Sequence, residues 1–392
     1  MSKAFNIFKK NQAQTFPYPS CLEIKSAQGS YIIDVNGKKY LDLVAGVSAC
    51  TLGHSNPIII NAIKDQLDKY AHVMVYGEYI QYPQYRLAKL LADNLPKNLD
   101  TTYFTNSGAE SIEGAIKLAK RATGRSEIIS CENSYHGSTN GALSIMGNEI
   151  YKSKFRPLIP NCNKIIYNKV DSLKSITHKT AAVVIEPVQG ASGFIMPKIK
   201  FLNILKERCE MTGTLLIFDE IQTGYGRLGY LFGFEKYDVI PDILCIAKGM
   251  GAGMPIGAFI TSWEIMNLLT FEPQLGHITT FGGHPVNCAA SLACLEYLIT
   301  SDIMNQIAHK EQLFRDHLKH PKIKEIRGSG LMLAIELDNE ILAKKVVEHS
   351  LNKGLILFYF LFTKTAIRVT PPLTISEKEI IHACNIIQKI LD

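Results

Sequence analysis

The sequence contains no long apolar run. Its start, Met1-Ser-Lys-Ala-Phe-Asn-Ile-Phe-Lys-Lys, has no apolar stretch of signal-peptide length. No later segment approaches the roughly 20 consecutive apolar residues that a membrane-spanning helix needs. Both absences argue against export and membrane insertion, and we expect a cytoplasmic protein.

Several other classes of motif are also missing. Nine cysteines are present, but none belongs to a Cys-x-x-Cys pair, and Cys131 and Cys245 lie within or beside apolar runs. Reduced buried thiols are therefore expected, and no metal site. The net charge is +6, yet the basic residues occur singly or in pairs, which does not make a nucleic-acid patch. No internal repeat or low-complexity linker appears.

The length and composition are those of a soluble globular protein with more than one domain. The chain has 392 residues, of which 46% are hydrophobic and 20% charged. We expect residues 1–55 to form an N-terminal segment of a small domain, 56–305 a large domain, and 306–392 the C-terminal part of the small domain.

The order of the predicted elements indicates an α/β fold. The residues around Asn36-Gly37 predict a hairpin, and Asn56-Pro57 predicts a helix start. Strand candidates then alternate with helices as far as residue 300, which predicts a mainly parallel sheet with helices on both faces. These strands are expected at 102–105, 127–131, 182–186, 214–219, 243–247 and 258–261. Later strands at 330–337, 355–362 and 367–369 and a helix from 376 to 390 predict a smaller α+β unit.

Two of these apolar strands end in a charged residue. The run Leu215-Leu-Ile-Phe ends in Asp219, and Ile243-Leu-Cys-Ile-Ala ends in Lys248. Ligands of open parallel sheets collect at the carboxyl ends of the strands, so both charges are expected to face one bound molecule. Pyridoxal phosphate (PLP) needs such a pair, because a lysine forms its Schiff base and an acid keeps its pyridine nitrogen protonated.

Three further strand ends offer groups for the same molecule. The residues Asn106-Ser107-Gly108-Ala109 lead into a helix, whose free N–H groups favour an anion such as a phosphate. Tyr135-His136-Gly137 places an aromatic ring where it can stack on a flat cofactor. Glu186 ends another strand in a carboxylate.

One motif suggests a different cofactor. Gly224-Tyr-Gly226-Arg-Leu-Gly229 matches the Gly-x-Gly-x-x-Gly pattern of nicotinamide-dependent dehydrogenases. That pattern requires a strand end at the first glycine and a helix at the third. Here Glu220-Ile-Gln-Thr intervenes and Tyr230-Leu-Phe-Gly is a poor helix start, so we interpret the motif as a loop.

The run from Leu216 to Gly253 resembles the signature of the class III aminotransferases, the ornithine, acetylornithine and 4-aminobutyrate type. The resemblance continues in order at Leu41-Asp42, Gly53-His54, Asn106–Glu110, Glu186–Gly190, Thr280–Pro285, Arg327–Leu331 and Arg368. It implies a fold-type I PLP-dependent transferase, with a mainly parallel seven-stranded sheet and a smaller α+β domain. It also implies a ping-pong transfer of an amino group from an amino acid or ω-amine donor to a small 2-oxo acid.

The resemblance implies roles for particular residues. Lys248 would form the Schiff base and act as the base, and Asp219 would pair with the pyridinium. The implied cofactor-binding residues are Ser107, Gly108 and Ala109 (phosphate), Tyr135 (ring stacking), His136, Glu186, Gln222 (phenolic oxygen) and Thr280. Thr280 would reach the phosphate of a neighbouring subunit, which implies a homodimer with shared active sites. Arg368 would bind a substrate carboxylate.

Two positions depart from the ornithine-type pattern. That branch usually has glutamate where this chain has Ala191, and arginine where it has Ser138. In that branch the glutamate pairs with the counterpart of Arg368 while an ω-amino donor is bound. The departures put ornithine, acetylornithine and 4-aminobutyrate in doubt, although ornithine and acetylornithine aminotransferases stay alternatives, as do aminomutases and racemases of the same fold.

Overall fold

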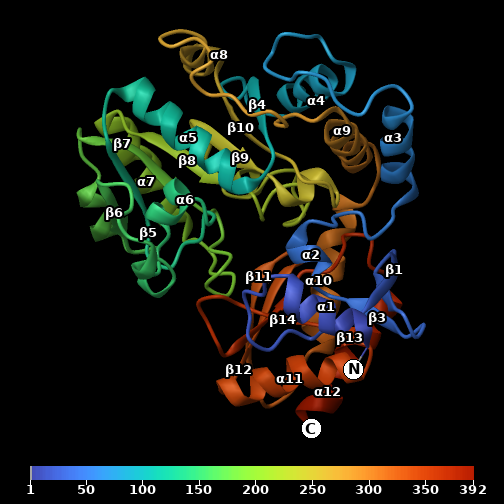
Figure 1. Cartoon of the computed structure of the whole chain (residues 1–392). Helices are drawn as coiled ribbons and strands as arrows, with labels where there is room; N and C mark the ends of the chain where they lie inside the picture. Colours follow the sequence, from blue (N-terminus) through green and yellow to red (C-terminus); the bar gives the residue numbers. More distant parts are fainter. Residues whose placement is uncertain (1) are drawn as a thin grey trace.

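The structure, a computed structural model, describes residues 2–392 and is built around one seven-stranded sheet (Figure 1). Its strands lie in the order β4 (Thr101–Thr105), β10 (Gly257–Thr261), β9 (Ile243–Ile246), β8 (Leu215–Asp219), β7 (Thr180–Ile185), β5 (Glu127–Cys131), β6 (Cys162–Ile165). Strand β10 is antiparallel to both its neighbours and the other pairs are parallel, so six strands share one direction. The predicted mainly parallel sheet is confirmed.

Helices bury both faces of this sheet because its strands are apolar on both sides. On one face, Val184 and Ile217 pack in a cluster with helix α5 (Gly108–Thr123). On the other, Val183 and Phe218 belong to a larger cluster that includes residues of three helices near the sheet. These helices are α4 (Tyr82–Asp93), α7 (Ile199–Thr212) and α9 (Pro285–Thr300). Such two-sided burial is typical of parallel sheets.

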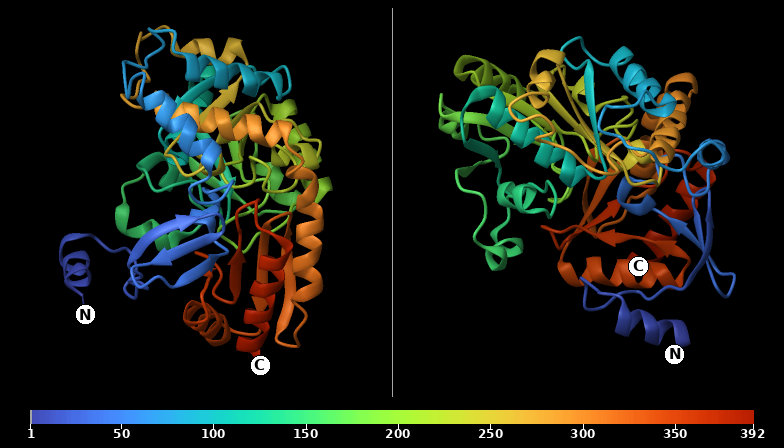
Figure 2. Two further views of the ribbon diagram at one scale, coloured as in Figure 1. Left: turned by 90° about the vertical axis from the view of Figure 1, so that its right-hand side faces the viewer. Right: turned by 45° about the horizontal axis from the view of Figure 1, so that its top comes forward.

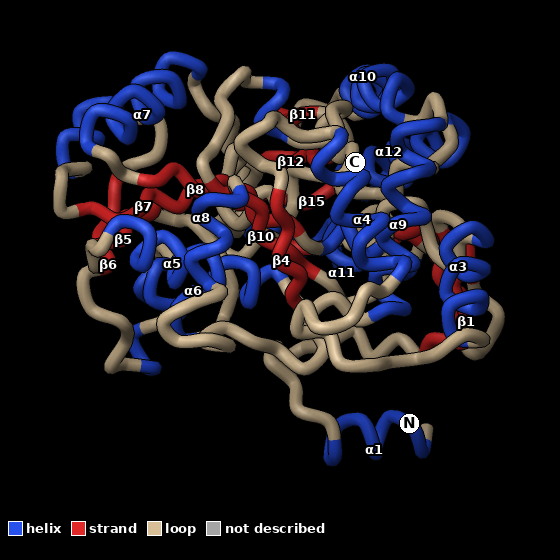
Figure 3. The backbone as a smooth tube through the Cα atoms, turned by 90° about the horizontal axis from the view of Figure 1, so that it is seen from above, coloured by secondary structure: helices blue, strands red, loops and turns tan. Residues whose placement is uncertain are grey.

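The remaining helices lie in several parts of the molecule. Helix α3 (Pro57–Leu67) packs against α9 and begins as predicted, because the Asn56 side chain accepts a hydrogen bond from the Ile58 N–H at 3.0 Å. The others are α1 (Lys3–Asn11), α2 (Ala45–Ser48), α6 (Asn140–Ile145), α8 (Trp263–Met266), α10 (Ile307–His317), α11 (Glu340–Asn352) and α12 (Glu377–Leu391). Helix α1 stands apart from the body of the molecule (Figures 2 and 3).

Two four-stranded sheets lie below the large sheet in Figure 1 and pack with α10, α11 and α12. One contains β1 (Ile24–Gln28), β2 (Tyr31–Asp34), β3 (Lys39–Asp42) and β13 (Leu355–Ile356). The other contains β11 (Ile323–Ser329), β12 (Met332–Leu337), β15 (Ala366–Val369) and β14 (Phe358–Tyr359). The division of the chain at residues 55/56 and 305/306 stays a prediction.

The predicted hairpin at Asn36-Gly37 is present, and one of its strands also pairs with a strand from the C-terminal region. Strands β2 and β3 pair antiparallel, and the Asp34 carboxylate accepts hydrogen bonds from the N–H groups of Asn36 and Lys38, each at 2.9 Å. Strand β3 then pairs in parallel with β13, Leu41 opposite Leu355. The N-terminal hairpin and the C-terminal region therefore share one sheet.

Among residues 2–392, no helix is long and apolar enough to cross a membrane. In the same described range, no group of three or more His, Cys, Asp or Glu side chains is placed to hold a metal ion. All nine cysteines are free.

Candidate active site

Loops from the carboxyl ends of three parallel strands meet at one edge of the large sheet. A Cβ atom added to Gly137, in the loop after β5, would lie 2.7 Å from the Ala109 Cβ, at the start of α5. A Cβ atom on Gly108 would lie 2.7 Å from the side chain of Ile221, in the loop after β8. Only glycine allows these approaches. The loops after β4, β5 and β8 are therefore in contact, as the sequence predicted.

The start of α5 is arranged to receive an anion. Ser107 is the N-cap, and its hydroxyl accepts a hydrogen bond from the Glu110 N–H at 3.2 Å. The N–H groups of Gly108 and Ala109 belong to the first turn, where a helix offers no internal acceptor. All three residues are half-buried. A free helix N-terminus beside the strand ends is a suitable phosphate site.

Asp219 and His136 form a buried pair at the centre of this edge. His136 Nδ1 lies 2.7 Å from Asp219 Oδ2, and the two side chains are almost completely buried. Asp219 Oδ1 accepts a hydrogen bond from the Ile221 N–H at 3.1 Å. The sequence assigned His136 to the cofactor site without naming its partner. The structure makes it a direct contact of Asp219, which fixes the orientation of the carboxylate.

Lys248 lies where β9 ends, next to the end of β8. The Glu220 N–H donates to the Cys245 carbonyl at 2.8 Å, which holds the two strand ends together. Burial lowers the pKa of the Lys248 ammonium; the charges of Asp219 and Glu186 oppose this shift, and Arg368 adds to it. The backbone of Lys248 is left-handed, with φ 45°. Residues other than glycine rarely adopt this conformation, and those that do often lie at functional sites.

Glu186 and Gln222 approach each other across Gly190. A Cβ atom on Gly190 would lie 2.6 Å from Gln222 Oε1 and 3.0 Å from Glu186 Oε2. The Glu186 carboxylate accepts hydrogen bonds from the N–H groups of Tyr135 (3.0 Å) and Gly190 (2.7 Å). Burial raises the pKa of Glu186 to about 7. Glu186 therefore ties the Tyr135 loop to the loop after β7.

Arg368 is a buried cation on β15, with 6% of its surface exposed. Within residues 2–392 its side chain forms no hydrogen bond or ion pair, and its Nε is buried without a partner. Burial lowers its pKa to about 10, so the guanidinium stays charged at neutral pH. The guanidinium lies against the rings of Phe194 and Phe360. A buried cation without a counter-ion is costly, so the site is prepared for an anionic ligand.

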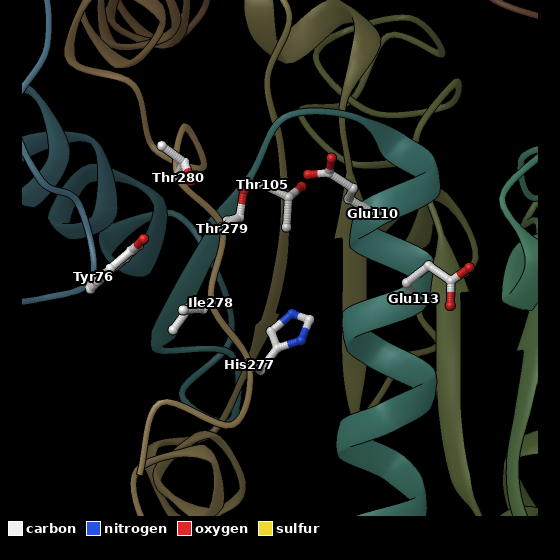
Figure 4. Close-up of a pocket in the computed structure, with 8 residues that line it drawn as sticks. All are labelled: Tyr76, Thr105, Glu110, Glu113, His277, Ile278, Thr279 and Thr280. Atoms are coloured by element: carbon white, nitrogen blue, oxygen red, sulfur yellow. The ribbon is translucent and has the colours of Figure 1, made fainter.

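Thr280 lies near the start of α5, in a hollow that does not include Lys248, Asp219 or Arg368. It lines this hollow of about 390 Å³ together with Tyr76, Thr105, Glu110, Glu113, His277, Ile278 and Thr279 (Figure 4). In the described chain, no hydrogen bond joins Thr280 to another candidate residue, whereas its neighbour Thr279 accepts one from Asn106 at 2.8 Å.

The loop from Gly224 to Gly229 does not have the geometry of a dinucleotide site. It consists of turns, and the next helical segment is one short 3-10 turn, Gly233–Lys236. Arg227 points into the protein, where its guanidinium donates to the carbonyls of Leu331 (3.1 Å) and Pro371 (2.5 Å). The loop connects the large sheet to the C-terminal region.

One feature near Lys248 had no signal in the sequence. The segment α2 (Ala45–Ser48) is a turn of left-handed helix, with φ of 49°, 60°, 61° and 68°. The Asp42 carboxylate accepts hydrogen bonds from the N–H groups of Val44 (2.8 Å) and Ala45 (3.1 Å) at its start. Ser48 Oγ accepts a hydrogen bond from Gln222 Nε2 at 3.2 Å. Only Gly46 suits this backbone, so composition does not predict it.

The phenylalanines beside Arg368 were also missed. Phe194, Phe360 and Arg368 come from three distant parts of the chain, and a single sequence contains no sign of such contacts.

PLP fits the donor set at this edge. A helix N-terminus suits its phosphate, a carboxylate held by a histidine suits its pyridinium nitrogen, and a lysine with a lowered pKa suits its aldehyde. The three glycines at 108, 137 and 190 let the segments that carry these groups approach one another closely.

Comparisons with known proteins agree with this geometry. Residues 13–391 match the profile of the family described as aminotransferase class III. The acetylornithine aminotransferase of Methanopyrus kandleri is 39% identical over 356 residues, which are 90% of each chain. Two solved structures superpose closely. A transaminase from a marine Virgibacillus has a TM-score of 0.93 and 27% identity, over 100% of this chain and 98% of its own.

The second is an amine transaminase from an uncultivated Pseudomonas species in its PLP-bound form. It has a TM-score of 0.86 and 26% identity, over 97% of this chain and 99% of its own. The fold, the arrangement of the strand ends and the family profile lead to one conclusion: the chain belongs to the class III aminotransferases, enzymes that use PLP to move an amino group from a donor to a 2-oxo acid.

Proposed function

We propose that Lys248 is the catalytic base and that Asp219, oriented by His136, holds the pyridinium nitrogen of PLP. PLP supplies an electron sink for the carbon that carries the amino group. Lys248 Nζ would take the proton from that carbon and deliver it to the cofactor carbon on the other side of the nitrogen. The lowered pKa of Lys248 supports this role, because a base must be partly neutral at the working pH.

The phosphate is assigned to the N-terminus of α5, at Ser107, Gly108 and Ala109. Tyr135 is assigned to the ring face, with Glu186 holding its loop through the Tyr135 N–H. Gln222, held by Ser48, is assigned to the phenolic oxygen. These groups position the cofactor, and only Lys248 and Asp219 take part in the chemistry.

The substrates we propose are α-amino acids and a small 2-oxo acid. The observation that carries this proposal is the buried Arg368 guanidinium, which has no acidic partner in the described chain. With Ala191 at the position of the usual glutamate, Arg368 is available to an α-carboxylate in both half-reactions. Ser138 lies 3.2 Å from the Tyr135 hydroxyl and supplies no cation for a second carboxylate.

A second candidate is an acetylornithine aminotransferase. It is favoured by the printed names of the curated relatives, among them the protein of Methanopyrus kandleri. That activity requires reaction at a terminal amine, with the α-carboxylate held away from the reacting carbon.

We also propose a homodimer in which Thr280 completes the partner's phosphate site. The surface around the Thr280 hollow is rich in exposed apolar side chains, and contiguous patches of this kind mark interaction sites. They are Val73, Met74, Tyr76, Tyr79, Ile80, Tyr82 and Tyr85 from one segment and Phe271, Leu275, Ile278 and Phe281 from another. A cytoplasmic location stays part of the proposal.

A donor panel tests the substrate assignment. Purified enzyme loaded with PLP is mixed with single amino donors, and the absorption change of the bound cofactor gives the rate of the first half-reaction. We expect α-amino acids to react faster than acetylornithine, ornithine and 4-aminobutyrate. We also expect Arg368→Gln to raise the KM for the best α-amino acid by about tenfold to a hundredfold, the effect of about 1.5–3 kcal/mol of charge-assisted hydrogen bonding. Faster reaction with acetylornithine would support the second candidate.

A further inference from the structure

The guanidinium of Arg368 is held by two aromatic rings and not by an acid. Its Cζ lies 5.1 Å from the centre of the Phe360 ring and 5.8 Å from that of Phe194. The two ring centres are only 4.7 Å apart, with an interplanar angle of 85°. A triangle with these sides places both rings on the same side of the guanidinium. Phe194 and Phe360, called the aromatic corner below, therefore contact the guanidinium from one side only.

Phe194 is kept in this position by an unusual backbone. It is completely buried and has φ 55°, which is a rare conformation for a bulky residue. The neighbouring bonds enforce it: Gln189 and Ile195 form a β-bridge, and Arg327 Nε donates to the Gly193 carbonyl at 3.0 Å. Conformations of this kind persist where the surroundings fix them, and they occur often at ligand-binding sites.

Phe360 is kept in place by the strand it follows and by two contacts from the large-sheet region. Phe358 pairs directly with Arg368 in the β14–β15 ladder. The Tyr151 hydroxyl donates to the Leu361 carbonyl at 2.8 Å, and the Phe362 N–H donates to the Ala191 carbonyl at 3.1 Å. Phe360 is thus fixed on the same short segment that pairs with the arginine it contacts.

We propose that Phe194 and Phe360 are positioning residues that hold Arg368 ready for the α-carboxylate of the substrate, in place of an internal acid. An aromatic face stabilises a desolvated cation without occupying its N–H groups. An internal carboxylate would occupy those groups, and the substrate would have to displace it. The aromatic corner stays in contact when the substrate binds, so a carboxylate that approaches from the opposite side has no internal ion pair to displace. This inference rests on the proposed function of Arg368.

Loss of one ring should therefore affect substrate binding more than turnover. Without the ring, the long Arg368 side chain samples several rotamers in the free enzyme, and the substrate must order it on binding. We expect Phe360→Leu to raise the KM for the best α-amino acid about fivefold, with kcat nearly unchanged. The inhibition constant of propionate, a carboxylate without an amino or oxo group, should rise by the same factor.

Matched variants separate this role from a structural one. Phe360→Tyr keeps the aromatic face and should restore the wild-type KM. Phe362→Leu removes a ring from the same segment. The centre of this ring lies 5.2 Å from that of Tyr151, and the ring does not contact the Arg368 guanidinium, so the KM should not change. Cofactor content and thermal midpoint are measured for each variant. If Phe360→Leu does not fold, Phe360→Met replaces the ring with an apolar side chain of similar size.

The outcomes distinguish this inference from the proposed function. A wild-type KM in folded Phe360→Leu or Phe360→Met, no rescue by Phe360→Tyr, or an equal loss in Phe362→Leu would overturn the inference. If Arg368→Gln raises the KM and the propionate inhibition constant while the Phe360 variants do not, only the inference fails. If Arg368→Gln changes neither, the proposed carboxylate site fails as well.

Discussion

Replacing Ala191 with glutamate would place an acid in the loop that carries Phe194. Ala191 has 6% of its surface exposed, and its carbonyl accepts a hydrogen bond from the Phe362 N–H, so the backbone there is fixed. The glutamate that the ornithine-type branch has at this position pairs with the counterpart of Arg368, so we expect a glutamate here to reach the buried guanidinium. In Ala191→Glu the substrate carboxylate must compete with an internal ion pair.

The expected size follows from two opposing energies. A pair of charges about 4 Å apart contributes about 4 kcal/mol at an effective dielectric constant of about 20. Removing the new carboxylate from water cancels much of this gain. A net coupling of about 1.5 kcal/mol, at the lower end of values for close charge pairs, remains and corresponds to about a tenfold higher KM for α-carboxylate substrates.

Steady-state kinetics of Ala191→Glu with the best α-amino acid and a 2-oxo acid would measure this change. Ser192→Glu is the matched control, because it adds the same charge one residue further along, where the Ser192 hydroxyl bonds to the Asn133 carbonyl at 2.7 Å. The KM should rise only in Ala191→Glu. An unchanged KM, or an equal rise in both variants, would refute the view that Arg368 lacks a competing acid.

Three other perturbations have defined outcomes. Lys248→Ala should still bind PLP, measured by its absorption after gel filtration, but lose turnover by several orders of magnitude; near-normal transamination would contradict the role of Lys248. Ile80→Glu, at a side chain that is 93% exposed, should produce monomers in sedimentation and impair PLP retention, whereas Ile341→Glu, at an 81% exposed residue on α11, should stay dimeric. Burial raises the pKa of Glu186 from 4.5 to about 7, so the folded protein holds a proton there that the unfolded chain releases, and the free energy of unfolding falls as the pH rises from about 4.5 to about 7. In urea titrations of the cofactor-free protein, Glu186→Gln should reduce the dependence of the free energy of unfolding on pH. Part of this dependence should remain, because burial also raises the pKa of Glu220 to about 7.

The large sheet was predictable where its strands are continuous apolar runs. β8 and β9 were expected within one residue of their observed bounds because each is an apolar run with a charged residue at its end or just beyond it. Strand β6 was missed because it lies at the edge of the sheet and is not a continuous apolar run. Of its four residues, Cys-Asn-Lys-Ile, only Ile165 is completely buried. The single strand expected at 355–362 was wrong. It is divided into β13 and β14, which join different sheets, and an apolar run does not show which sheet its parts will enter.

The candidate site was predictable to the extent that it lies at strand ends. Lys248, Asp219 and the start of α5 follow directly from short apolar runs that stop at polar residues. The aromatic corner depends instead on contacts between Phe194, Phe360 and Arg368, which only the tertiary fold creates. The left-handed turn at Ala45–Ser48 is likewise imposed by its anchors at Asp42 and Thr370, against the preference of its own residues.

The pairing of β3 with β13 also determines when the protein can finish folding during synthesis. Leu41 leaves the ribosome 314 residues before its partner Leu355. At about 5–20 residues per second, the N-terminal hairpin waits about 15–60 s with one edge unpaired. During this interval the unpaired edge of β3 can pair with other nascent chains. Substitutions at this edge should therefore change the dependence of folding on chaperones in the cell more than they change the stability of the finished enzyme.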